Sequence, residues 1–158
     1  MATTVQARFP LVASVDAVLS RLADPAFVDQ RTAANPGLSG VLVDHSDDGQ
    51  TIVIRTRAAV PMDWLPSAVT ARVTTLPTVE REEVWDRGSG SGSMRFGISG
   101  VPAKAGGSMR LDAQGSGSVL TYRVDLQVDM PFVGGIVEKA VAAQIRRSLQ
   151  AEAALYGE

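Results

Sequence analysis

The chain has 158 residues, of which 45% are hydrophobic and 20% charged, a composition typical of globular domains rather than disordered chains. A net charge of −2 gives no electrostatic reason to expect nucleic acid as a partner. Cysteine is absent, which excludes disulfides and thiolate metal sites. No apolar run approaches the roughly 20 residues that cross a bilayer, and the N-terminus lacks the apolar core of a secretory signal. We therefore expect a single cytoplasmic domain over residues 1–158, without a membrane span.

The N-terminal part of the chain predicts one strand followed by two short helices. Apolar and polar residues alternate over Val5–Leu11, and Pro10 would confine this strand to an edge or an end of a sheet. Ser14 is a candidate N-cap for a first helix that ends before the next proline. A second short helix is expected from about residue 25 to residue 34, because the Asn-Pro-Gly sequence at 35–37 is a stop signal.

Period-2 alternation from residue 38 onward predicts six further strands. They cover residues 38–44, 51–59, 78–87, 94–99, 109–113 and 120–130. In the third of these, Val79, Val84 and Trp85 do not share one parity, which predicts a bulge. The segment 62–73 interrupts the alternation, and Asp63 is a candidate cap of a short helix there.

The last forty residues hold the clearest pattern in the chain. Strand 120–130 places apolar residues on one face and polar residues on the other, as in a sheet with one dry face. An amphipathic helix of roughly 25 residues follows, from about residue 132 to residue 156. Its apolar stripe comprises Val137, Val141, Ile145, Leu149, Ala153 and Tyr156, with Gln144 beside it. We expect this helix to lie across the dry face, which gives an α+β fold.

This order of elements resembles the helix-grip fold of the START-like, or SRPBCC, superfamily. That superfamily includes polyketide cyclases, plant allergen-type proteins and lipid-transfer domains. More narrowly, the chain is similar to an uncharacterised bacterial family known only as a domain of unknown function. The segments that carry the resemblance are Ala59–Pro66, Val79–Trp85, Ser99–Ala103 and Met130–Glu138. The resemblance implies a seven-stranded curved antiparallel sheet wrapped around a long C-terminal helix, with two short helices after the first strand.

The resemblance also implies a cavity between the concave face of the sheet and the long helix, open near the second short helix. Tyr122 and Gln144 are the polar groups expected to point into it and orient a ligand. Trp64, Leu65 and Val69 would lie over its mouth. The candidate ligand-binding residues are Ile54, Thr56, Trp64, Leu65, Val69, Trp85, Met94, Phe96, Ile98, Met109, Leu111, Tyr122, Val124 and Gln144.

Other patterns in the chain point to no catalytic residue, metal or cofactor. His45 is the only histidine, and we expect it in a solvated hairpin turn because a zinc site would need further His or Cys ligands. The Gly-Ser run at 88–93 precedes a strand rather than a helix, so it does not fit a phosphate loop.

A group of glutamates in strand 78–87 allows two interpretations. They are either paired acid–base carboxylates or, as we favour, the solvated face of a strand with a bulge, opposite arginines of a neighbouring strand. The residues are Glu80, Glu82 and Glu83, with Arg55 or Arg57 opposite.

Three functions remain open from the sequence. The first, favoured because the expected concave wall is apolar, is binding or carrying a hydrophobic small molecule such as a lipid, fatty acid or polyketide-like compound. The second is a cyclase/aromatase- or hydrolase-like enzyme using Tyr122 with a carboxylate or arginine, which requires an ionisable pair inside the pocket. The third is a protein–protein interaction module that exposes Trp64 and Leu65. The oligomeric state is left open.

Overall fold

The computed structural model describes residues 3–35, 39–60, 67, 71 and 77–156. In chain order its elements are β1 (Thr3–Leu11), α1 (Val15–Leu22), α2 (Pro25–Ala33), β2 (Ser39–Asp47), β3 (Thr51–Ala59), β4 (Thr78–Asp86), β5 (Ser91–Ile98), β6 (Ala103–Gln114), β7 (Gly117–Val128) and α4 (Gly134–Tyr156). The helix expected near Asp63, with Trp64, Leu65 and Val69, lies outside the described residues.

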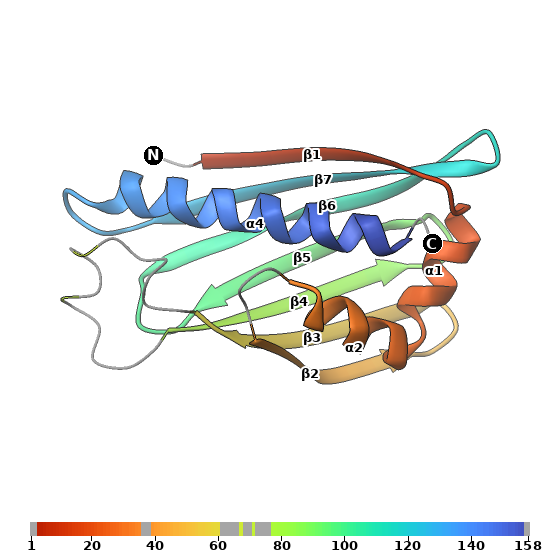
Figure 1. Ribbon diagram of the computed structural model, residues 1–158, viewed down its shortest axis with the longest axis horizontal. Helices are drawn as coiled ribbons and strands as arrows, with labels where there is room; N and C mark the ends of the chain where they lie inside the picture. Colours follow the sequence, from red (N-terminus) through yellow and green to blue (C-terminus); the bar gives the residue numbers. More distant parts are fainter. Residues whose placement is uncertain (1–2, 36–38, 61–66, 68–70, 72–76, 157–158) are drawn as a thin grey trace.

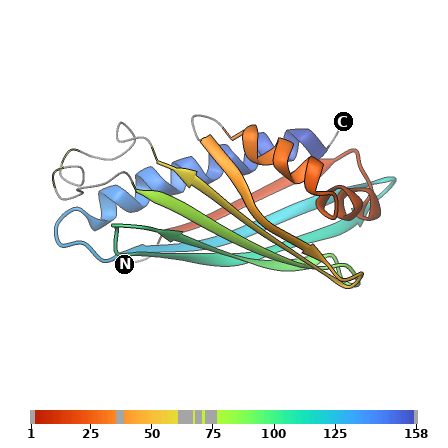
Figure 2. The same ribbon diagram turned by 90° about the horizontal axis from the view of Figure 1, so that it is seen from below.

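The seven strands form one antiparallel sheet in the order β1-β7-β6-β5-β4-β3-β2. Within the described residues, helices α1, α2 and α4 lie on the same face of this curved sheet (Figures 1 and 2). Helix α4 packs on β1 and β7, whereas α2 packs on β2 at the opposite edge. The predicted helix-grip fold is therefore confirmed, and the strand that contains Pro10 is an edge strand as expected.

Helix α4 is held against the sheet along its apolar stripe and at both ends. Val137, Ile145 and Leu149 are buried in the interior. Near the N-terminal end, Glu138 accepts hydrogen bonds from the Thr3 hydroxyl (2.8 Å) and the Val128 backbone N–H (3.0 Å). These bonds lower the pKa of Glu138, that from Val128 most strongly. At the other end, the Arg21 guanidinium of α1 donates to the carbonyl oxygen of Tyr156 (2.6 Å). The position of α4 on the sheet is thus fixed at each end.

The prediction of a bulge in strand 78–87 is wrong. Strand β4 pairs with β3 and β5 without any shift of register, and the one shift in these pairings lies in β2, between Leu42 and Asp44. In β4 the inward positions 81, 83 and 85 are all buried, whereas Val84 faces the other side and is only half-buried. The sequence suggests a bulge because the apolar Val84 faces outward, whereas two of the inward residues, Arg81 and Glu83, are charged.

Some boundaries differ from those expected by a few residues. Strand β2 continues to Asp47, so His45 lies in a strand and not in the turn predicted for it. Helix α4 begins at Gly134, two residues later than the periodicity suggested. Among the described residues, no helix combines the length and the apolarity needed to cross a membrane.

Replacing Leu149 by alanine should test the docking of α4. Leu149 is only 1% exposed, so Leu149→Ala should lower the free energy of unfolding by about 2–5 kcal/mol through lost burial and a new cavity. Ile136→Ala on the same helix is the control, because Ile136 is 57% exposed and its loss should cost within about 0.5 kcal/mol. Urea unfolding followed by tryptophan fluorescence measures both, and similar losses in the two variants would contradict the docking described here.

Candidate functional site

A cavity of about 470 Å³ lies between α4 and the sheet. One wall is the side of α4 that carries Val137, Ala140, Val141 and Ile145, and the other comes from the strands β3 to β6 with the end of α2. The strand residues that line it include Thr56, Ala58, Val79, Arg81, Phe96, Ile98 and Ala105. Its lining is mainly apolar, as in pockets that bury small organic molecules.

The structure brings only part of the sequence-predicted site to this cavity. Thr56, Phe96, Ile98 and Gln144 line it. The other described candidates are buried in the main hydrophobic core and do not line the cavity: Ile54, Trp85, Met94, Met109, Leu111, Tyr122 and Val124. Strand parity indicated their inward direction, but it gave no sign that α1, α2 and the last turns of α4 fill this half of the sheet's inner face.

Cross-strand register shows where the filled part ends and the cavity begins. Ile54, Glu83 and Met94 lie side by side on adjacent strands, and all three are fully buried. The next inward row, which includes Arg81, borders the cavity; from β3 to β6 it consists of Thr56, Arg81, Phe96 and Ala105. The cavity therefore starts at the inward-facing row directly next to the last row of the packed core.

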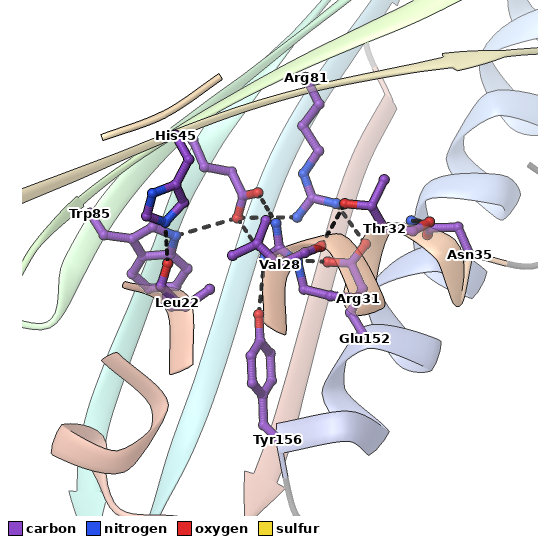
Figure 3. Close-up of polar contacts among 11 residues, drawn as sticks. Leu22, Val28, Arg31, Thr32, Asn35, His45, Arg81, Trp85, Glu152 and Tyr156 are labelled. Carbon is purple, nitrogen blue, oxygen red and sulfur yellow. Dashed lines mark hydrogen bonds and ion pairs between the residues drawn. The ribbon is translucent and has the colours of Figure 1, made fainter. Parts of the chain in front are cut away.

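Four charged side chains are buried together beside this boundary, and we call them the charge cluster: Arg31 of α2, Arg81 and Glu83 of β4, and Glu152 of α4. Figure 3 labels Arg31, Arg81 and Glu152 among them. Arg31 donates hydrogen bonds to Glu83 Oε1 (3.1 Å) and to the Tyr156 hydroxyl (2.9 Å), and its second terminal nitrogen contacts Glu83 Oε2. Arg81 Nη1 donates to Glu152 Oε2 (2.7 Å). The cluster contains two cations and two anions, so its charges cancel.

Three members of the charge cluster, Arg31, Arg81 and Glu83, stay ionised at neutral pH. Burial alone would raise the pKa of Glu83, but the Arg31 and Arg81 guanidiniums outweigh it and hold the pKa far below the usual range. Burial would likewise lower the pKa of both arginines, yet the nearby carboxylates keep each above its ordinary value. Burial raises the pKa of Tyr156 to about 12. None of these shifts brings a pKa close to neutral pH, where a general acid or base works best.

Arg81 is the member of the charge cluster that faces the cavity, and it has unused hydrogen-bonding capacity. Its Nε and Nη2 atoms are buried but make no hydrogen bond, although Nη2 lies 3.3 Å from Glu83 Oε1 as an ion pair. The guanidinium carbon lies 5.6 Å from the centre of the Phe96 ring, within cation–π range. Asn35, just beyond α2, also lines the cavity, and its buried Oδ1 has no hydrogen-bond partner.

Sequence reasoning missed Arg81, Thr32 and Asn35 as cavity residues. The signal for Arg81 was present, because it shares the parity of Val79 and Trp85, but charged residues were assigned to the solvated face. Thr32 of α2 and Asn35, two residues after α2, carry no comparable signal, since only the packing of α2 on β2 brings them to the cavity. Tyr122, expected to orient a ligand, is fully buried; its hydroxyl has no hydrogen-bond partner, and burial raises its pKa well above the ordinary value.

The expectation for the glutamates of β4 is confirmed for two of them and wrong for the third. Glu80 and Glu82 lie on the outer face and pair with Arg57 and Arg55 respectively, as the favoured interpretation had it. The expectation that Glu83 lies on the solvated face is wrong, because this side chain is completely buried.

His45 is partly buried in strand β2 rather than lying in the turn. Its Nε2 donates to the carbonyl oxygen of Leu22 (2.9 Å), which ties β2 to α1. Within the described ranges, no three His, Cys, Asp or Glu side chains are grouped closely enough to hold a metal ion.

Solved structures of other proteins share this architecture. The crystal structure of the Zhui aromatase/cyclase from a Streptomyces species is similar with a TM-score of 0.68 and 13% identity, covering 99% of this chain and 94% of that chain. A START superfamily protein from Mycobacterium smegmatis is similar with a TM-score of 0.59 and 13% identity, covering 97% of this chain and 96% of that chain. The fold is therefore that of the START-like, or SRPBCC, superfamily.

Sequence comparison assigns the family within that fold. The family described as "Protein of unknown function (DUF2505)" matches residues 4–158, so the chain belongs to the DUF2505 family. An uncharacterised protein of Mycobacterium tuberculosis is 32% identical over 114 residues. That match covers 69% of this chain and 65% of the relative, so the chain spans slightly less than two thirds of the relative's length.

Removing one carboxylate from the charge cluster should strongly destabilise the protein. Glu83→Gln leaves two buried arginines with a single carboxylate, so we expect a loss of about 3–5 kcal/mol in the free energy of unfolding. Glu82→Gln is the matched control on the outer face of the same strand, where a largely solvated ion pair contributes little. Chemical denaturation of both variants measures the difference, and equal effects would show that burial of the charge cluster is unimportant.

The charge cluster should also make stability depend on pH in the acid range. The pKa of Glu83 is about 2 in the folded protein, whereas glutamate in an unfolded chain titrates near 4.3. A lowered folded pKa stabilises fully above the unfolded value, and this contribution is lost as the pH falls towards the folded value. The free energy of unfolding of the wild type should therefore approach that of Glu83→Gln between about pH 5 and pH 2. Parallel pH profiles for the two proteins would contradict this assignment.

Proposed function

We propose that this protein binds or carries a hydrophobic small molecule, such as a lipid, a fatty acid or a polyketide-like compound, in the cavity between α4 and the sheet. The observation that carries the proposal is the cavity itself, with a volume of about 470 Å³ and a mainly apolar lining. That volume falls within the range of roughly 300–1,000 Å³ typical of ligand pockets. Side chains fill the inner face of the sheet beside α1 and α2 but leave this space beneath the N-terminal half of α4.

The comparison with the Streptomyces aromatase/cyclase supports the same class of ligand by analogy. That protein is named an aromatase/cyclase, and it shares the architecture of this chain at low sequence identity. A shared fold does not transfer an activity, so the argument for this chain rests on its own cavity.

The enzyme alternative has weaker physical support than binding. It requires an ionisable pair inside the pocket, and Arg81 with Glu152 lies at the boundary of the cavity. The pKa shifts, however, hold Glu83 and the arginines in their charged forms and the tyrosines in their neutral forms. A group that does not change protonation near neutral pH is a poor general acid or base, which favours binding over proton transfer.

Filling the cavity should weaken ligand binding. Ala140 lies on the cavity wall of α4, so Ala140→Phe should occupy part of the space and reduce affinity for the neutral fluorescent probe N-phenylnaphthylamine by roughly tenfold. Ala154→Phe on the same helix is the control, because Ala154 is exposed and does not line the cavity. Probe fluorescence titration measures both. Absence of probe binding to the wild type, or equal binding to both variants, would contradict the proposal.

A further inference from the structure

The solvent-facing side of α4 carries positive charge and no carboxylate. Both glutamates of the helix, Glu138 and Glu152, point inward and are buried. Its cations, Lys139, Arg146 and Arg147, are exposed, and none of them forms an ion pair with a described residue. From residue 136 onward the exposed positions of α4 recur at helical spacing and make one continuous face. We call this face the outer stripe: Ile136, Lys139, Ala143, Arg146, Arg147, Gln150 and Ala154.

An exposed aromatic side chain precedes the outer stripe. Phe132, in the connection between β7 and α4, is 100% exposed, and Ile136 in the first turn of α4 is also exposed. The φ angle of Phe132 is 69°, in the left-handed region that favours glycine. The Val133 N–H donates to the Pro131 carbonyl oxygen across it (2.9 Å), which closes a tight, strained turn. A strained backbone that holds a fully exposed ring indicates a contact outside the molecule.

The opening of the cavity adjoins the same surface. Ala143 and Arg147 belong to the outer stripe and also line the cavity. Because both residues are exposed, the cavity reaches the surface of the molecule beside the outer stripe.

Charge is unevenly distributed over the helical side of the molecule. Among the described residues of α1 and α2 and the link between them, the exposed carboxylates are Asp16, Asp24 and Asp29. Helix α1 lies beside the C-terminal end of α4, whereas the connection that holds Phe132 lies at the other end (Figure 1). The end with Phe132 and Lys139 is therefore the apolar and cationic one, and a negatively charged partner should approach it.

We propose that Phe132 and the outer stripe dock this protein on the surface of an anionic lipid bilayer. The cations lie against the headgroups, while Phe132 and Ile136 enter the boundary between headgroups and acyl chains. A protruding ring needs a matching recess in a protein partner, whereas the boundary region of a bilayer accepts it without one. Docking brings the opening of the cavity to the membrane, where a hydrophobic molecule passes between bilayer and cavity. The docking itself goes beyond the proposed function and does not depend on it.

Vesicle binding by the wild-type protein tests the partner. Large unilamellar vesicles of phosphatidylcholine alone are compared with vesicles of equal parts phosphatidylcholine and phosphatidylglycerol in a cosedimentation assay. Affinity for the mixed vesicles should be at least about tenfold higher, and added sodium chloride should reduce this preference. No binding to the mixed vesicles, or equal binding to both kinds, would overturn the proposal. Titration with N-phenylnaphthylamine tests the proposed function separately, so the two failures are distinguishable.

Charge reversal tests the outer stripe. The double variant Lys139→Glu with Arg146→Glu should lower the affinity for the mixed vesicles by at least about tenfold. Arg8→Glu with Lys104→Glu is the matched control, because it reverses one arginine and one lysine that are exposed on the opposite face of the sheet. Equal losses in the two double variants would show that net charge governs binding, which contradicts docking through α4.

Phe132→Gly separates docking from folding. Glycine adopts a φ of 69° without strain, so the melting temperature should stay the same or rise. Affinity for the mixed vesicles should nevertheless fall roughly tenfold, because the inserted ring is lost. Val12→Ala is the control, since Val12 is 81% exposed but lies between β1 and α1. Wild-type vesicle affinity in Phe132→Gly would refute the proposal. So would a wild-type dimer in sedimentation equilibrium that Phe132→Gly converts to a monomer, because a second copy would then cover this surface.

Discussion

The interior of this protein depends on the pairing of four buried charges contributed by α2, β4 and α4. Each charge would cost several kcal/mol if it were buried without a partner, so the cluster is tolerable only when all three elements are in place. Such a cluster adds little net stability compared with apolar packing, but a misplaced helix leaves a charge uncompensated. Arg31 and Glu152 therefore make the positions of the two helices on the sheet specific, where hydrophobic contact alone would tolerate sliding.

The charge cluster also stands between two different halves of the interior. On one side, Trp85 and its neighbours pack against the short helices and the end of α4. On the other side, α4 passes over the sheet with small residues such as Ala140 facing it, and the space remains open. The cavity consequently has an apolar body, with the buried Arg81 at the boundary next to the charge cluster.

Much of the fold could be predicted because its signals are local. Strict alternation identified β1 and β7, a helical stripe identified α4, and Pro10 correctly placed β1 at an edge. Local patterns failed where polarity was taken as a measure of exposure. Glu83 was assigned to the solvated face with Glu80 and Glu82, although alternation from Trp85 places it inward, and a bulge was invoked to reconcile the strand. The burial of Glu83 depends on partners that are distant in sequence.

The candidate site was predictable only in part for the same reason. Outside β4, the sequence by itself determined which residues of the clearly alternating strands face inward, because side chains alternate along a strand whatever lies above it. Only the tertiary structure decided which inward residues border empty space, because that depends on where α1, α2 and α4 come to rest. Thr56 and Ile54 are two residues apart on one strand and look alike by parity. Thr56 lines the cavity and Ile54 lies in the packed core, because side chains fill the space beside Ile54 but not beside Thr56.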